Sequence, residues 1–310
     1  MLRIVYHHVL LIGFLAVMMR PLQASAQEAA GVAYLKTGST ARELAMGESG
    51  VSLVQGASSA YWNPAGLAMH GSQEVMATYQ RWVGSVRFYA ALGHMTRGLQ
   101  DGWGGFVQAV TEEGEEGKSR VALATAGLGY GRRFGRVSAG IMVKGLAEHV
   151  LTETLYGYAI DVGMQVVWYG VQWGMVLQNM GSVQELEAFT APLPRTFRTG
   201  VSFYPLRMVT LLDNQPVLEL VVTVDYVHRP DAHEPFWGKG VGSWHLGGAL
   251  KALDLVEWRI GYITRDTVRE FSLGFGVWFN RVYVDYAYIP FKPGFEGTAG
   301  HVFSLSTRWL

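Results

Sequence analysis

Few side chains in this sequence are spaced for chemistry. The densest group lies in one segment, where His228, His233 and Glu234 offer the imidazole and carboxylate donors that divalent metals bind. Because the segment also contains Pro230 and Pro235, it has no fixed local geometry to hold these donors together. We therefore expect a solvated loop and no metal site.

A second group is acidic, with Glu112, Glu113, Glu115 and Glu116 close together in the chain. Divalent ions could bridge these carboxylates to lipopolysaccharide, but solvated charge is the simpler interpretation. Elsewhere the sequence has no Gly-x-Ser-x-Gly nucleophile, no Gly-x-x-x-x-Gly-Lys phosphate loop and no His-Glu-x-x-His metal motif. We therefore expect neither enzyme activity nor a cofactor.

The composition is that of a chain with few charges. Of 310 residues, 49% are apolar and 16% are charged, whereas soluble domains carry about 25% charged residues. The formal net charge is zero, which removes any general case for binding nucleic acid. Because there is no cysteine, the chain has neither a disulfide framework nor a thiolate metal site.

Residues 1–26 have the pattern of a secretory signal peptide. Arg3 gives a weakly basic start, residues 9–19 form an apolar run, and Ala24-Ser25-Ala26 supplies a small-x-small cleavage site. The run is shorter than the about 20 residues that cross a bilayer as a helix. We expect an exported protein whose mature chain begins at Gln27; the alternative is a short N-terminal anchor.

Beyond residue 26, large apolar residues alternate with small or polar ones. The pattern is clear in 271–279 and 156–168, and it recurs in 171–177, 218–226 and 282–288. A period of two places the two sets of side chains on opposite faces of a strand. No segment here approaches 18 consecutive apolar residues, so helical membrane spans are excluded.

A soluble β-sandwich and a membrane β-barrel share this pattern, and three features favour the barrel. Many runs are about 9 to 13 residues long, which suits a tilted strand that crosses a bilayer. Aromatic residues collect at the ends of runs, as in the interfacial girdles of barrels. A dry sandwich core does not hold many unpaired ions, whereas the less apolar face here carries Arg136, Lys144, Asp161, Arg198, Glu219, Asp225, Arg281 and Asp285.

The alternation predicts an all-β chain, a transmembrane antiparallel β-barrel of about 14 strands formed by residues 73–310. Residues 27–72 contain few alternating runs, so we expect them to fold into the lumen as a hatch or plug. Such a barrel belongs in the outer membrane, with long loops such as 180–194 and 228–240 on the outside. The expected strands are 73–80, 85–95, 102–111, 119–131, 136–147, 155–168, 171–179, 195–205, 216–227, 241–251, 254–264, 268–279, 281–289 and 302–310.

The stretch "AYWNPAG" is the main candidate site, because Tyr61, Trp62, Asn63, Pro64 and Gly66 combine bulk with a turn. Asn bonds its own backbone, Pro fixes φ and Gly accepts a positive φ. We expect the two aromatic rings to wedge this turn against the barrel wall where the hatch meets the first strand. The alternative is a contact with a ligand.

Charges on the inward face are the second candidate site. We expect Asp161 to pair with Arg198, and Asp285 with Arg308, as structural ion pairs rather than proton relays. On the same alternation, lysine should be tolerated at Ser272 but not at its lipid-facing neighbour.

Three blocks of sequence resemble one known family. The first, "GVAYLKTGSTARELAMGESGVSLVQGASSAYWNPAGLA", carries an aromatic-Leu-Lys-x-Gly start, an Ala-Arg-x-x-x-Met-Gly block and a Tyr-Trp-Asn-Pro-Ala-Gly block in that order. The middle segment "LQNMGSVQELEAFTAPLPRTFRTGVSFYP" and the closing segments "VYVDYAYIPF" and "HVFSLSTRW" are similar to the same family. On these residues the chain resembles the PorV/PorQ family, a branch of the FadL-like outer-membrane barrels.

The resemblance implies a 14-stranded barrel with an N-terminal hatch and a role in type IX secretion. In that role, long outer loops bind, shuttle or anchor secreted protein at the cell surface. The alternative is a FadL-like channel whose hatch moves or exposes a lateral opening for uptake of hydrophobic small molecules. The partners expected are outer-membrane lipid, secretion-system or cargo proteins and, for the alternative, a hydrophobic small molecule; the residues alone favour neither role.

Overall fold

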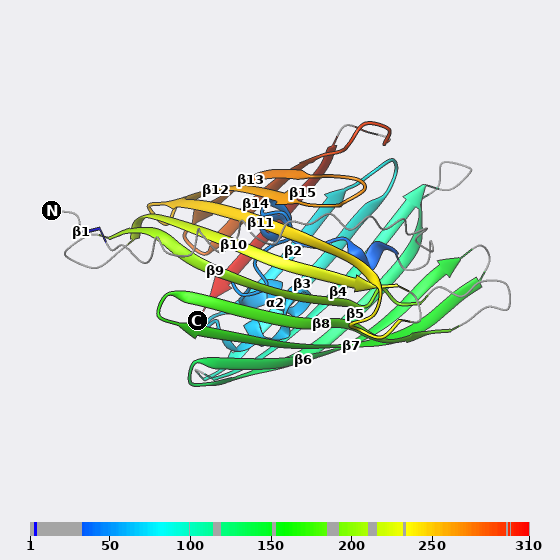
Figure 1. The fold of residues 1–310 in the computed structure, drawn as a ribbon, viewed down its shortest axis with the longest axis horizontal. Helices are drawn as coiled ribbons and strands as arrows, with labels where there is room; N and C mark the ends of the chain where they lie inside the picture. Colours follow the sequence, from blue (N-terminus) through cyan, green and yellow to red (C-terminus); the bar gives the residue numbers. More distant parts are fainter. Residues whose placement is uncertain are drawn as a thin grey trace.

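The computed structural model is a closed barrel of fourteen antiparallel strands (Figure 1). The predicted signal peptide lies outside the described residues except for β1 (Arg3–Ile4), which pairs with β9. In the described part of the chain, no helix is long and apolar enough to cross a membrane. The structure describes residues 3–4, 33–98, 100–113, 119–150, 153–184, 192–209, 216–231, 234–295, 297 and 299–309.

The barrel strands follow one another around the ring in chain order, and the last strand pairs with the first to close it. Each predicted strand is present, with ends within four residues of the predicted ones. The strands are β2 (Gln73–Arg81), β3 (Arg87–Arg97), β4 (Asp101–Glu113), β5 (Ser119–Phe134), β6 (Val137–Val150), β7 (Glu153–Trp168), β8 (Val171–Val183), β9 (Thr196–Val209), β10 (Pro216–Pro230), β11 (Gly240–Ala252), β12 (Val256–Ile263), β13 (Phe271–Phe279), β14 (Val282–Pro290) and β15 (Ala299–Trp309).

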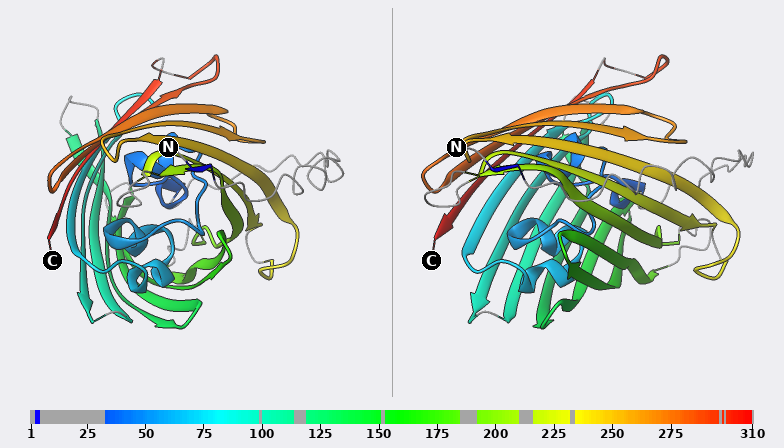
Figure 2. Two further views of the ribbon diagram at one scale, coloured as in Figure 1. Left: turned by 90° about the vertical axis from the view of Figure 1, so that its left-hand side faces the viewer. Right: turned by 60° about the vertical axis from the view of Figure 1, so that its left-hand side comes forward.

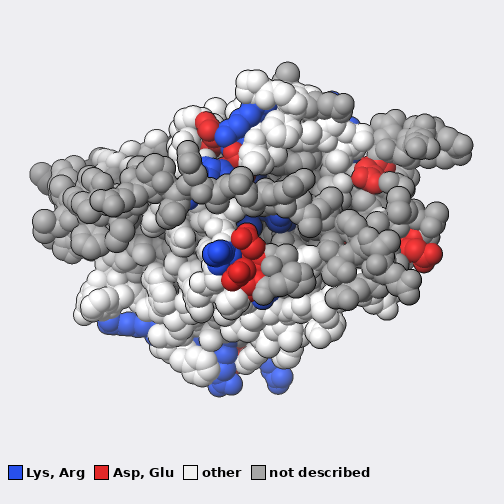
Figure 3. Space-filling model, turned by 45° about the vertical axis from the view of Figure 1, so that its right-hand side comes forward, with Lys and Arg blue, Asp and Glu red and all other residues white. Residues whose placement is uncertain are grey.

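The outer face of the barrel is apolar. Leu128, Val107 and Leu273 point outward and are about half exposed or more, whereas the residues beside them in the chain are buried or less exposed. Exposed aromatic side chains mark strand ends, as at Trp168 and Tyr169. On the face in Figure 3, most of the described surface is neither acidic nor basic, and charged side chains form a few separate groups. This is the distribution of a barrel with lipid around it.

Residues 33–72, which we call the inner segment, lie inside the barrel (Figure 2). Helix α1 packs against β12 to β15, and η5 packs against β3 to β7 on the other side of the lumen. The segment thus touches most of the wall. Its elements are η3 (Ala33–Lys36), α1 (Ala41–Ala45), η4 (Gly56–Ser58), α2 (Ser59–Trp62) and η5 (Pro64–Ala68).

Glycines on the lumen face let the inner segment approach the wall closely. A Cβ built at Gly174 would lie 2.6 Å from the Val51 carbonyl oxygen, and one at Gly131 would lie 2.8 Å from that of Pro64. Real Cβ atoms essentially never come this close to backbone, so side chains are excluded at these positions. The wall glycines whose added Cβ would lie within 3.0 Å of a backbone or side-chain atom of the segment are Gly102, Gly104, Gly131, Gly140, Gly163, Gly174, Gly247, Gly261 and Gly274.

The close fit corrects one expectation from the sequence. Ser272 does lie on the inward face, but its side chain is 2% exposed because α1 packs directly over it. Its Oγ donates to the Ala45 carbonyl and accepts from the Gly47 N–H, each at 3.0 Å. A lysine has no room there, so the prediction that Ser272→Lys is tolerated is wrong.

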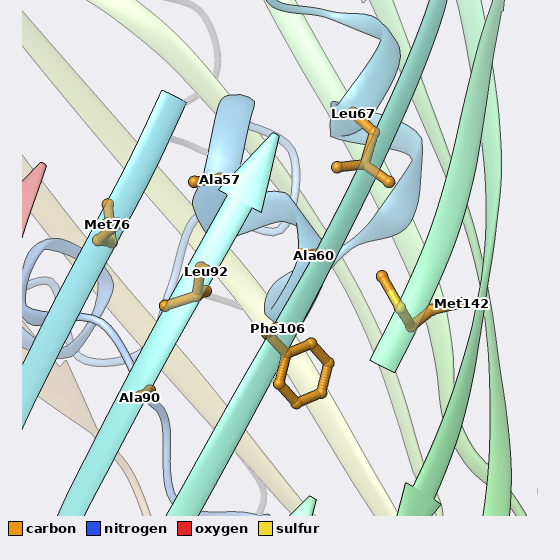
Figure 4. Packing of buried hydrophobic residues seen from close by; sticks show 8 residues of the cluster. All are labelled: Ala57, Ala60, Leu67, Met76, Ala90, Leu92, Phe106 and Met142. Atoms are coloured by element: carbon orange, nitrogen blue, oxygen red, sulfur yellow. The ribbon is translucent and has the colours of Figure 1, made fainter. Parts of the chain in front are cut away.

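An apolar core joins the inner segment to one side of the wall (Figure 4). Ala57, Ala60 and Leu67 of the segment pack with inward-facing residues of neighbouring strands. The wall side of this inner cluster consists of Met76, Ala90, Leu92, Phe106 and Met142, and the partly buried Tyr61 packs against it.

Candidate functional site

Asn63 ties the inner segment to itself and to the wall. Its Oδ1 accepts a hydrogen bond from the Ala65 N–H at 3.1 Å, which caps η5. Its Nδ2 donates to the Val51 carbonyl at 2.9 Å and lies 3.3 Å from the Met164 carbonyl on β7. The side chain is fully buried. Asn63 and Pro64, which is the first residue of η5, therefore form a turn that also connects the inner segment to β7.

The two aromatic residues before this turn have different neighbours. The ring of Tyr61 packs edge-on against Phe106 of β4, with centroids 5.5 Å apart, and its hydroxyl donates to the Thr37 carbonyl at 2.7 Å. The indole Nε1 of Trp62 donates to the Thr40 Oγ1 at 2.6 Å, within the inner segment. Both residues thus fasten the inner segment to itself and contact the wall, Tyr61 at Phe106 and Trp62 at Arg198, whose guanidinium carbon lies 5.3 Å from the centre of the indole.

Gly66 is present for a reason other than the one predicted. Its φ is not positive, since it is absent from the positive-φ glycines of the described chain. A Cβ at this position would meet the Val54 carbonyl and the Ser59 hydroxyl. Close approach of two parts of the inner segment, and not turn geometry, requires the glycine.

The predicted ion pair between Asp161 and Arg198 is not formed. Asp161 instead lies 2.7 Å from Lys144 on the adjacent strand β6, and it accepts the Asn179 N–H at 2.8 Å. Because β8 separates the strands of Asp161 and Arg198, the two are not neighbours on the wall. Arg198 contacts Asp225 of the next strand at 3.8 Å.

The predicted pair between Asp285 and Arg308 is also not formed. Strands β14 and β15 are adjacent, but Asp285 stands opposite Ser304, so Arg308 is four residues further along. Asp285 lies 2.6 Å from Arg259 instead, while Arg308 pairs with a glutamate of β2. All four predicted residues therefore carry ion pairs, but with partners that only the strand register reveals.

Glu48 of the inner segment is the centre of a buried charge group that reaches the wall. It is 1% exposed, forms an ion pair with Arg269 and lies 3.9 Å from Arg198, and its Oε1 accepts the Gly38 N–H at 3.0 Å. Burial alone would raise the pKa of Glu48, but Arg269 and then Arg198 outweigh it and lower the pKa to about 2. The carboxylate therefore stays ionised and holds the segment to the wall.

A carboxylate of the wall binds the backbone of the same segment. Oδ2 of Asp225 on β10 accepts the N–H groups of Gly50 and Val51 at 2.9 and 3.0 Å. His245 of β11 adds a contact, with its Nδ1 2.7 Å from the Gly47 carbonyl. These contacts fix residues 47–51 against β10 and β11.

Glu74 holds the segment at the seam of the barrel. The residue lies on β2 and is fully buried, and its Oε2 accepts the Ala57 N–H at 3.0 Å. Its Oε1 lies 3.0 Å from Nε of Arg308 on β15, as a charge contact without hydrogen-bond alignment. One side chain thus contacts both the inner segment and the closing strand pair.

A serine and a histidine meet beside this seam. Ser72 Oγ lies 2.7 Å from Nε2 of His70, the spacing of a nucleophile and its base. Burial and the nearby Arg308 charge lower the pKa of His70 to about 4. A base needs a pKa near the working pH, so this histidine is poorly matched to proton abstraction at neutral pH.

Several residues of the suggested metal site and of the acidic group lie outside the described residues. His228 belongs to β10 rather than to a loop, while His233, Glu115 and Glu116 fall outside the described residues. Among the described residues, no three His, Asp or Glu side chains gather as metal ligands would.

An apolar hollow lies in the membrane-facing wall over β2 to β6 and β14 to β15. It has a volume of about 890 Å³. Its floor consists of small residues such as Ala77, Ala91, Gly93 and Gly105, and larger ones such as Leu128 form its rim. The lining also includes Met76, Leu92 and Phe106 of the inner cluster, so apolar residues line both faces of the wall here.

Comparison with known proteins shows the fold. No family model matches the sequence, and no curated protein matches it. The crystal structure of the P. putida toluene transporter TodX superimposes with a TM-score of 0.55 and 10% identity, covering 88% of this chain and 99% of that one. A TodX deltaS2S3 mutant, described as a monoaromatic hydrocarbon channel, gives 0.52 and 11% over 87% of this chain and 98% of that one.

Proposed function

We propose that this protein is an outer-membrane barrel that passes hydrophobic small molecules through its side wall. The observation that carries the proposal is the apolar hollow, which lies directly outside the inner cluster. An apolar molecule dissolved in the bilayer enters such a hollow without desolvating charge. A route along the axis is less suited, because the inner segment and its ion pairs occupy the lumen.

The wall is thin where the two apolar regions meet. Gly93 and Gly105 stand opposite each other on β3 and β4, and Ala91 lies two residues from Gly93 on the same face. With so little side chain on the outer surface, mainly the hydrogen-bonded backbone of β3 and β4 separates the hollow from the inner cluster, and passage requires these two strands to part. Likeness in fold to a toluene transporter agrees with an apolar cargo.

A matched pair of glycine substitutions tests this route. A Cβ at Gly93 meets no atom within 4 Å, and the same is true of Gly145, which does not line the hollow. In a bacterial host with the chain in its outer membrane, we expect faster uptake of labelled toluene than in the empty host. Gly93→Leu should abolish this gain and Gly145→Leu should keep it. Equal uptake by both variants would refute the route.

The secretion role implied by the PorV/PorQ resemblance stays a prediction. It depends on long outer loops that lie partly outside the described residues, at 185–191 and 232–233. It predicts that deleting these loops stops cargo secretion in cells, while toluene uptake is absent from the start. The two roles therefore give opposite results in the same host.

A further inference from the structure

Two arginines stand directly opposite each other at the long-loop end of β2 and β3. Arg81 ends β2 and Arg87 begins β3, and the register of the two strands pairs them. The Cα atoms of paired residues in antiparallel strands lie about 4.5 to 5.5 Å apart, so both guanidinium groups can reach one ligand. Like charges at such positions destabilise a sheet.

No described carboxylate neutralises this pair. In the described ranges neither arginine forms an ion pair, and Arg81 makes no side-chain hydrogen bond. Nη1 of Arg87 donates to the carbonyls of Gly84 and Val86 at 3.1 and 2.9 Å, which are uncharged acceptors. Glu112, at the same end of β4, instead accepts a hydrogen bond from a tyrosine of the inner segment at 3.2 Å.

Two exposed arginines at the opposite end of the barrel do have carboxylate partners. Nε of Arg132 lies 3.7 Å from Asp101, and Nε of Arg207 lies 3.1 Å from Glu219. The pair of Arg81 and Arg87 is thus a double positive charge on the outer surface that these single, compensated arginines do not match.

Two further residue pairs continue from the arginines toward the middle of the membrane. Tyr79 stands opposite Tyr89, with ring centroids 5.4 Å apart, and Ala77 stands opposite Ala91. All four share the outward face with the arginines, because even numbers of residues separate them along each strand. The two alanines line the apolar hollow. Over about 13 Å of the same two strands, the outer surface therefore changes from charged to aromatic to apolar.

We propose that Arg81 and Arg87 bind a phosphate group of lipid A, the phosphorylated and acylated disaccharide of lipopolysaccharide. The long loops of bacterial barrels face outside, so the arginines lie in the outer leaflet, where lipopolysaccharide is found. Guanidinium groups match phosphate oxygens with paired hydrogen bonds. A phosphate monoester carries a charge of about −1.5 to −2, which balances the two arginines.

The surface below the arginines fits the rest of the same lipid. Tyr79 and Tyr89 offer half-exposed rings to the sugar, and the apolar hollow beneath them accepts acyl chains. The site goes beyond the proposed channel, because it binds a lipid on the outer surface whether or not apolar molecules cross the wall.

Titration of the full chain in detergent with lipid A tests the site. A chelator is present, so that divalent ions cannot bridge phosphate to carboxylates. We expect saturable binding to the unmodified protein and binding about tenfold weaker, or weaker still, when Arg81→Gln and Arg87→Gln are combined. Arg132→Gln combined with Arg207→Gln is the control, since it removes the same charge at the opposite end, and it should bind lipid A normally.

Two other lipids identify the group that is bound. Dephosphorylated lipid A keeps the sugars and acyl chains, and it should bind equally weakly to the unmodified protein and to the variant without Arg81 and Arg87. Phosphatidylglycerol has a phosphate diester with a single charge, and it should bind more weakly than lipid A. Absence of saturable binding, equal affinity of the two double variants for lipid A, or equal affinity for lipid A and phosphatidylglycerol would overturn the proposal.

A single substitution covers the case in which the double variant does not fold. Because Arg81 has no hydrogen-bond or ion-pair partner among the described side chains, Arg81→Gln should keep its melting temperature without lipid while its affinity for lipid A falls. Arg81→Lys keeps the charge without the planar fork, so its affinity should be intermediate. Unchanged affinity in Arg81→Gln would overturn the assignment. Toluene uptake is measured separately in cells, so failure here leaves the proposed channel untouched.

Discussion

Arg269, in the loop that precedes β13, forms a buried ion pair with Glu48 of the inner segment. Both side chains are at most 5% exposed, and the pair crosses from the wall to the interior of the lumen. The inner segment is therefore held by charge as well as by close packing, and the two kinds of contact can be tested separately.

Glu48→Gln should strongly destabilise the protein. It removes the buried carboxylate that Arg269 and Arg198 share and leaves only Asp266 to Arg269 and Asp225 to Arg198. Removing one partner of a buried ion pair typically costs about 3–5 kcal/mol. Glu270→Gln is the control, because Glu270 and Lys292 form an exposed pair worth about 0–1 kcal/mol. Thermal unfolding in detergent measures both. Similar melting temperatures for the two variants would contradict a holding role for Glu48.

Acid should weaken the same contact. The pKa of Glu48 is about 2 in the folded protein and 4.5 when unperturbed, so its contribution is complete above about pH 4.5 and is lost as the pH falls toward 2. Melting temperatures followed from pH 7 to pH 2 should fall more steeply in the unmodified protein than in Glu48→Gln. Parallel curves would show that another carboxylate is responsible.

Asn63→Ala should loosen the turn without removing bulk from the wall. The loss leaves the buried Ala65 N–H unpaired, at a cost of about 1–3 kcal/mol, and removes one of the two donors to the Val51 carbonyl, the other being Gln165. Gln55→Ala, at an exposed position of the same segment, should have little effect. With Pro64→Ala added, cells should leak large antibiotics. Unchanged antibiotic sensitivity in that double variant would rule out a latch at this turn.

Two glycines of β6 should differ in their tolerance of alanine. At Gly140 a Cβ would meet backbone atoms of Pro64 and Ala65, whereas at Gly145 it meets nothing within 4 Å. Gly140→Ala should displace η5 and make the inner segment sensitive to added protease, while Gly145→Ala should not. Equal protection of the two variants would mean that η5 does not rest on the wall.

The free-energy cost of a charge on the outer face should depend on its depth in the membrane. Leu273 is half exposed within β13, and Phe279 ends the same strand. Leu273→Lys should cost about 2–4 kcal/mol and Phe279→Lys about 0–1 kcal/mol, because charge is tolerated near the interface. Unfolding in lipid vesicles measures the difference. Equal costs would argue against a bilayer around β13.

The strands were predictable because lipid on one side imposes a period of two on every one of them. Leu273 and Ser272 illustrate this, since their opposite directions follow from the alternation alone. What surrounds the inward face was not predictable. The tight cover over Ser272 depends on contacts between residues more than 200 positions apart in the chain.

The predicted ion pairs were wrong for a related reason. Choosing Arg198 for Asp161 needed only opposite charge and a shared face, whereas the actual partner, Lys144, depends on which strands are adjacent and in which register. Glu48 gave one weak signal that was missed, because it is a lone acidic residue in a run of small ones. An isolated charge among residues that bury themselves needs a partner from elsewhere in the fold.

Glu74 also bears on how the molecule is assembled. Its carboxylate touches Arg308 only once β15 has come round to β2, and it touches Ala57 only when the inner segment is seated. Closure of the barrel and placement of the inner segment should therefore be cooperative, since either one alone leaves one oxygen of the buried Glu74 carboxylate without its partner. A barrel that closes without the inner segment in place should therefore be the less stable product.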